Sequence, residues 1–103
     1  MNHTLYTNKD LENKNLKLKI HGIKFDKKRW YLAKALNWVI REGYVPIIDV
    51  VTLDNYYIIS LCKFKKDDRY TNHFYPVLDK GGRKTGIEFI FQITKRKAEQ
   101  LGI

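Results

Sequence analysis

The strongest constraint on the fold is one helical stripe in a chain that otherwise alternates like β-strands. Apolar or small residues recur at about 100° per residue along one side of this segment: Leu32, Ala35, Leu36, Val39, Ile40 and Gly43. Gly43 and the nearby Pro46 indicate where the helix ends. Asp26 could serve as an N-cap, but a helix from there would turn Trp30 toward the polar side. The pattern therefore favours a start at Tyr31, with Trp30 folded back against the first turn.

The segment before the helix has the period of a strand. In "LKLKIHG", residues 16–22, leucine and isoleucine alternate with lysine and histidine, which predicts an apolar inner face and a basic outer face. The phase changes after Gly22, because Ile23 and Phe25 are the next apolar residues. A β-bulge at Gly22 would reconcile the two halves.

Two hairpins are expected after the helix. Residues 46–64 place Ile and Val on both sides of Asp54-Asn55, which suits a turn, and their two apolar faces suggest a central position in a sheet. Residues 73–93 predict a second hairpin across the turn at 80–83, with Pro76 on an edge strand. Odd-numbered apolar residues from Ile87 to Ile93 alternate with Glu88 and Gln92, so the second face of this strand should be mostly wet.

The order of these elements defines the expected fold class. It is α+β: an antiparallel sheet of about four to five strands with one main helix packed on one face, in the order β-α-β-β-β-β. The tail "TKRKAEQLG" could add a short C-terminal helix. With 103 residues, 44% of them hydrophobic, one folded domain is expected over residues 16–103. The polar residues 1–15 are expected to form a flexible arm.

The charge is strongly basic and unevenly spread. Twenty Lys and Arg against eleven Asp and Glu give a formal charge of +9. Residues 16–44 contain eight basic and two acidic side chains, and residues 61–84 contain seven basic and three acidic ones. Such a field attracts polyanions, of which nucleic acid is the commonest, although solvated lysines on an ordinary surface would give the same composition.

Catalytic, metal and cofactor chemistry is not indicated by the sequence. His3, His21, His73 and Cys62 are scattered over different predicted elements, and no carboxylate pattern typical of a nuclease is found. The glycines of "DKGGRKTG" lack the Gly-Lys-Ser/Thr ending of a phosphate loop, so a hairpin turn is the better interpretation. Cys62, the single cysteine, is expected to be a small buried hydrophobe in a strand. We therefore predict a non-enzymatic protein without cofactor or metal.

The basic and aromatic residues form the candidate site. Lysine and arginine can neutralise phosphates, and aromatic rings can stack on bases. The predicted nucleic-acid-binding residues are Lys27, Lys28, Arg29, Lys34, Arg41, Lys63, Lys65, Lys66, Arg69, Arg83 and Lys84. Trp30 and Trp38 are expected to pack the helix onto the sheet. The tyrosines at 56, 57, 70 and 75 are the better candidates for exposure, although a cross-strand role is the commoner one.

One extended pattern resembles a small domain that recurs in proteins of phages and large DNA viruses. It comprises "FDKKRW", then Ala, Trp and Gly-Tyr on one helix, the aromatic strand "NYYIISLCKFKK" and the closing strand "GIEFIF", and covers roughly residues 23–92. Tyr31 stands where that pattern usually has a Thr or Ser helix cap. The resemblance implies a viral or phage origin and an α+β fold. It carries no assigned activity and therefore no functional residue.

These observations lead to two expected functions. The first is a largely sequence-independent nucleic-acid-binding accessory protein of a virus or phage, acting on DNA or RNA. The second is a small viral protein that binds and modulates a host or viral protein through its basic and aromatic surface, which would meet an acidic patch. A homodimer through an edge strand is a further expectation. Without a signal peptide or a membrane-spanning stretch, an intracellular location in host cytoplasm or nucleus is expected, with no secretion and no membrane partner.

Overall fold

The computed structural model describes residues 19–47 and 50–102. The expected flexible arm (residues 1–15) and the beginning of the first predicted strand (residues 16–18) lie outside the described residues.

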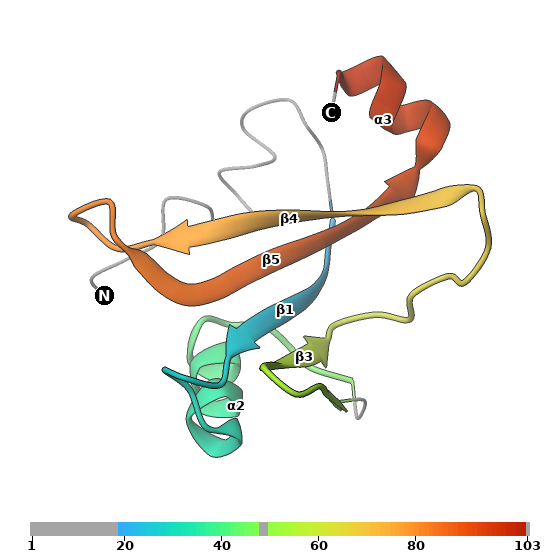
Figure 1. The fold of residues 1–103 in the computed structure, drawn as a ribbon. Coiled ribbons are helices and arrows are strands. Elements are labelled where there is room, and N and C mark those ends of the chain that lie inside the picture. The colour runs from blue at the N-terminus through green and yellow to red at the C-terminus, as the bar shows by residue number, and fades with distance from the viewer. Residues whose placement is uncertain (1–18, 48–49, 103) are drawn as a thin grey trace.

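Within the described residues, five strands form one antiparallel sheet in the order β2-β3-β1-β5-β4 (Figure 1). The strands are β1 (Ile20–Asp26), β2 (Val50–Thr52), β3 (Tyr56–Ser60), β4 (Tyr70–Leu78) and β5 (Lys84–Thr94). The main helix α2 (Leu32–Arg41) connects β1 to β2, and the short helix α3 (Lys95–Leu101) follows β5 directly. The predicted α+β class, the element order and the short C-terminal helix are confirmed.

Strand β1 lies in the middle of the sheet and contains the predicted bulge. Ile20 pairs with Phe91 but Gly22 pairs with Ile90, so the register shifts at His21, one residue before the predicted position. The His21 carbonyl accepts hydrogen bonds from the backbone N–H groups of Leu61 (2.8 Å) and Cys62 (3.3 Å). As expected, the bulge lets the strand continue past Gly22. Because the alternation resumes after the bulge, β1 continues to Asp26.

One face of the sheet forms the core with α2. Ile23, Phe25 and Phe89 are fully buried there, together with Ala35 and Val39 of the helix. Burying a side chain of the size of Phe or Ile stabilises a fold by roughly 1.5–3 kcal/mol. This face therefore supplies most of the stability of the domain.

Both tryptophans pack against this core, as predicted. The rings of Trp30 and Trp38 meet the Phe25 ring edge-on, with centroids 5.2 Å and 5.9 Å away. The helix begins at Leu32 with Tyr31 as an extended cap residue that makes no side-chain cap hydrogen bond. Asp26 closes the turn after β1 instead, because its carboxylate accepts from the backbone N–H of Lys28 at 2.9 Å.

Both predicted hairpins are present. Strands β2 and β3 pair across residues 53–55, and β4 and β5 pair across a turn in which the Asp79 carboxylate accepts from the N–H groups of Gly81 and Arg83. Pro76 lies in an edge strand as predicted. The central position expected for the first hairpin was wrong for β2, since β2 is the other edge of the sheet and its three residues are exposed.

Candidate functional site

The second face of the sheet carries chemically mixed side chains. Lys24 pairs with Ile58 and Glu88, so its side chain and theirs point away from the face that packs on α2. The buried residues of α2 and α3 belong to the core on the other face. We call the second face the open face; its side chains include Lys24, Tyr56, Phe74, Pro76 and Glu88.

Lys24 stands at the centre of the open face. Its Nζ lies 3.5 Å from Oε1 of Glu88, 4.1 Å from the centroid of the Tyr56 ring and 5.2 Å from that of the Phe74 ring. The Lys24 side chain is 25% exposed and that of Glu88 is 37% exposed. Since water reaches both charges, the pair contributes little stability. Its main effect is to hold a cation and a carboxylate between two aromatic rings.

Beside this group lies a pocket of about 560 Å³, which we call the sheet pocket. Its lining residues are Lys24, Asp26, Lys28, Arg29, Asn55, Tyr56, Pro76, Lys84, Gly86, Ile87 and Glu88. Four cations and two carboxylates leave a formal charge of +2 around it. The sheet pocket therefore offers cations, acceptor oxygens and an aromatic wall within one ligand-sized space.

The turn after β1 is fixed to the beginning of β5, and this contact brings the cations together. The Arg29 guanidinium Nη1 donates to the Lys84 carbonyl, and Nε1 of Trp30 donates to the Thr85 carbonyl at 2.8 Å. Gly86 makes the approach possible: its φ is +82°, and a β-carbon there would lie 3.0 Å from Cδ of Arg29. Lys28, Arg29 and Lys84 thus meet although more than fifty residues separate them.

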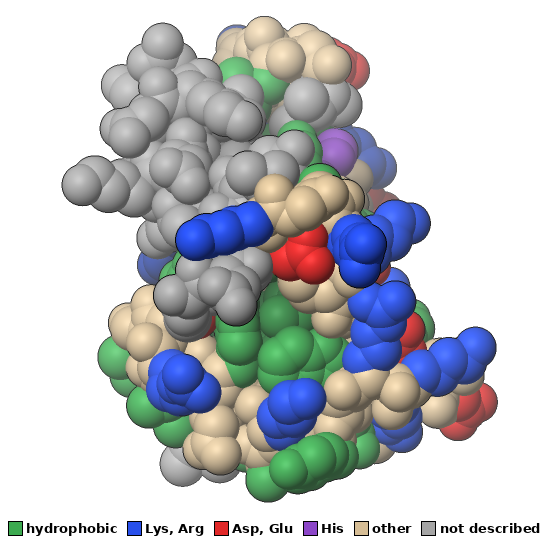
Figure 2. Space-filling view, turned by 90° about the vertical axis from the view of Figure 1, so that its left-hand side faces the viewer, with side chains coloured by type: hydrophobic (Ala, Val, Ile, Leu, Met, Phe, Trp, Pro, Cys, Tyr) green, Lys and Arg blue, Asp and Glu red, His purple; other side chains and the backbone are tan. Residues whose placement is uncertain are grey.

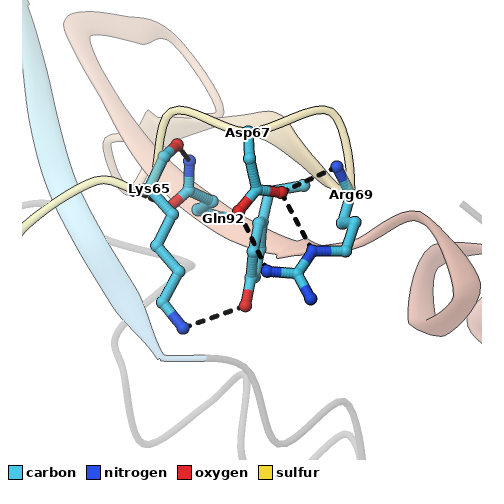
Figure 3. Close-up of polar contacts among 5 residues, drawn as sticks. Lys65, Asp67, Arg69 and Gln92 are labelled. Carbon is cyan, nitrogen blue, oxygen red and sulfur yellow. Dashed lines mark hydrogen bonds and ion pairs between the residues drawn. The ribbon is translucent and has the colours of Figure 1, made fainter.

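A second basic group lies at the other end of β5, in the β3–β4 connection. The Gln92 side chain accepts from the Lys65 N–H at 2.6 Å and donates to the Lys65 carbonyl at 2.8 Å (Figure 3). Gln92, expected to be wet, is only 7% exposed, because this connection crosses the open face above it. The side chain of Phe64 also lies on this face, 3.0 Å from where a β-carbon of Gly22 would be.

Part of this second group is internally neutralised. Asp67 pairs with Arg69 at 3.2 Å, and this contact lowers the pKa of the Asp67 carboxyl and raises that of the guanidinium. Lys65 Nζ donates to the Tyr70 hydroxyl at 2.9 Å (Figure 3). Gln92 follows Lys84 by eight positions, or about 26 Å along an extended strand. The two basic groups are therefore separate.

The predicted site residues are distributed over both groups and their surroundings. Figure 2 looks onto the side with the β4–β5 turn, at the left in Figure 1, and shows Lys and Arg side chains around a hydrophobic patch, with fewer acidic ones between them. Lys28, Arg29 and Lys84 line the sheet pocket. The remaining ones lie as follows: Lys27 over the Tyr57 ring, Lys34 over the Trp30 ring, Arg83 in the β4–β5 turn, Arg41 at the end of α2, and Lys63, Lys65, Lys66 and Arg69 in the β3–β4 connection.

Several residues of the sheet pocket are absent from the sequence-based set. Lys24 lies inside a predicted strand and Asp26 and Glu88 are acidic, whereas the predicted set contains basic side chains of the helix and of the segments next to the helix and the hairpins. A signal existed: Lys24 alternates with Ile23 and Phe25 as Glu88 does with Ile87 and Phe89. Pairing the two strands would have placed both charges side by side.

The four candidate tyrosines and the single cysteine lie in different surroundings. Tyr57 and Tyr75 pack against the core, and Tyr57 also has Lys27 over its ring. Tyr56 and Tyr70 contact Lys24 and Lys65. Cys62 lies in a bend after β3 and not in a strand as expected. Burial raises the pKa of its thiol, and the positive charge of Lys19 lowers it by a smaller amount.

Among residues 19–47 and 50–102, no three His, Cys, Asp or Glu side chains are grouped closely enough to hold a metal ion.

No protein-family model, curated protein sequence or solved structure matches this chain. Neither of the described helices has the length and hydrophobicity that crossing a membrane requires.

Proposed function

We propose that this chain is a non-enzymatic nucleic-acid-binding protein that contacts phosphates with the cations around the sheet pocket. The observation that supports the proposal is the convergence of Lys24, the Lys28-Arg29 pair and Lys84 from three chain segments on one pocket. An accessory role in a phage or large DNA virus is the setting that the sequence resemblance implies.

The chemistry of phosphate contacts explains why such a group suits a polyanion. Lysine and arginine displace condensed counterions from nucleic acid, a gain that does not depend on base sequence. Aromatic rings beside the cations add base stacking. Asp26 and Glu88 repel a phosphate, so the affinity is expected to be modest. Because the attraction depends on counterion release, the affinity should also fall as the salt concentration rises.

A titration with matched charge variants tests the proposal. Fluorescein-labelled oligonucleotides are titrated at salt concentrations from about 50 to 200 mM, and the slope of affinity against salt is measured. Lys28→Ala with Lys84→Ala should lower affinity and reduce the slope by about 2. Lys63→Ala with Lys66→Ala removes the same charge from exposed positions at the other end of the sheet and serves as the control.

Two results would contradict the proposal in different ways. Absence of binding at low salt would remove nucleic-acid binding altogether. Equal losses in both double variants would show that binding follows total charge and that the sheet pocket has no special part in it.

A protein partner is the second candidate, and the outer edge of β2, which pairs with no further strand among the described residues, favours it. Val50 and Val51 are 36% and 41% exposed there, and Val50–Thr52 contains no proline or lysine that would discourage strand pairing. The β4 edge is less suitable, since Pro76 lacks an N–H and the register shifts after Val77. Co-purification that survives nuclease treatment but is abolished by Val51→Lys would support this candidate over the first.

A further inference from the structure

We infer that the sheet pocket takes an unpaired base of a single strand, and that Glu88 favours bases carrying an exocyclic amino group. The inference rests on the proposed nucleic-acid binding and names the ligand of the same site. Its starting point is the mixed charge of the pocket, in which two carboxylates lie among four cations.

The carboxylates discriminate between the two forms of nucleic acid. A duplex presents its phosphates outward and keeps its Watson–Crick edges paired, so Asp26 and Glu88 would meet only like charge. A single strand can turn a base into the pocket, where carboxylate oxygens accept from base N–H groups, while its phosphates remain on the cations. Lys28 and Lys84 are exposed, as phosphate contacts require, whereas Asp26 and Glu88 are partly buried.

Apolar surface for a base is present on the same face. Tyr56 and Pro76 line the pocket, and Phe74 is 48% exposed beside it. Lys24 lies over the Tyr56 ring at 4.1 Å and is farther from Phe74, at 5.2 Å. Phe74 therefore retains more ring surface for stacking, a contribution that every base can use.

Glu88 gives this site a preference among bases. An ionised carboxylate only accepts hydrogen bonds. Cytosine, adenine and guanine present amino groups to it, whereas thymine and uracil present carbonyl oxygens on both sides of their single N–H. Lys24, 3.5 Å from Oε1 of Glu88, holds the carboxylate in place and leaves its other oxygen for a base.

Oligo-dC and oligo-dT provide the test, with a duplex of mixed sequence as a third probe, all at neutral pH and low salt. The native chain should bind oligo-dC more tightly than oligo-dT by about fivefold, the lower end of what one carboxylate contact to a base supplies. It should also bind either single strand more tightly than the duplex. In Glu88→Gln the side-chain amide can donate to a carbonyl oxygen, so the dC to dT ratio should fall toward one.

A matched variant separates recognition from charge. Glu99→Gln, on the exposed side of α3, changes the net charge by the same amount and should retain the ratio. Equal binding of oligo-dC and oligo-dT by the native chain, an unchanged ratio in Glu88→Gln, or tighter binding of the duplex would each overturn the inference and leave the proposed function standing. Failure of all three probes to bind would remove the proposed function and this inference with it.

Discussion

Replacement of Gly86 by alanine is expected to damage the joint between the β1–α2 turn and β5. The residue has a φ of +82°, which alanine adopts only with strain. Its new β-carbon would lie 3.0 Å from Cδ of Arg29 and 3.3 Å from Nε1 of Trp30. Both neighbours would have to move, and both donate hydrogen bonds to β5 at Lys84 and Thr85.

The expected loss has two parts. Alanine at a positive φ lowers the free energy of unfolding by about 1 kcal/mol, after allowance for the smaller entropy of the unfolded chain. Disturbing two hydrogen bonds adds about 1–3 kcal/mol, at roughly 0.5–1.5 kcal/mol each. Gly86→Ala should therefore destabilise the domain by about 2–4 kcal/mol, a large share of the total for a domain of this size.

Gly82→Ala is the matched control, and its comparison with Gly86→Ala isolates the steric part of the destabilisation. Gly82 also has a positive φ, +78°, but a β-carbon there meets nothing within 4 Å. Urea unfolding followed by tryptophan fluorescence should give a midpoint for Gly86→Ala about 1–2 M below that of Gly82→Ala. Equal midpoints would refute the reasoning, because they would mean that the close approach of Arg29 and Trp30 contributes nothing.

Three further substitutions probe other contacts. Gln92→Leu should lower the free energy of unfolding by about 2–3 kcal/mol in urea titrations, because it leaves the Lys65 N–H and carbonyl without their partner beneath the connection. Thr94→Ala removes the side chain that accepts from the Lys97 N–H at the start of α3 and should cost about 1 kcal/mol by the same measurement, whereas Thr94→Ser should restore most of it. Hydrogen bonding to Arg69 lowers the pKa of Asp67, so the stability that the ionised carboxylate contributes is present at neutral pH and is lost as the pH falls through the folded-state pKa. The difference in the free energy of unfolding between the native chain and Asp67→Asn should therefore vanish in acid. A difference that grows in acid would contradict this assignment.

The sequence was sufficient for the fold because its local signals agree with one another. The helical stripe ends at a glycine near a proline, and both hairpin turns contain residues suited to them. Errors arose where a long-range contact decided the outcome. Gln92 looks exposed by alternation, but the β3–β4 connection covers it. The edge position of β2 depends on where β1 inserts, which no local pattern records.

The candidate site was less predictable than the fold for the same reason. Basic side chains can be counted in a sequence, but their grouping depends on docking of the β1–α2 turn against β5, which requires Gly86 and the Trp30 indole. Lys28 and Lys84 consequently share a pocket, whereas Lys63 and Lys66 belong to another part of the surface. Charge composition led only to the hypothesis of a polyanionic partner, and strand pairing was needed to locate Lys24 and Glu88.

The docking of the turn also bears on how the site could work. The backbone N–H of Lys28 donates to the Asp26 carboxylate, and the side chains of Arg29 and Trp30 donate to carbonyl groups of β5. This part of the pocket rim is therefore already ordered before any ligand binds. Ordering a flexible lysine-bearing loop would consume about 0.5–1.5 kcal/mol per immobilised side chain. A rim fixed to the central strands avoids part of that loss. The contacts that stabilise the domain at this end are therefore the same ones that would give a modest charge of +2 a useful affinity.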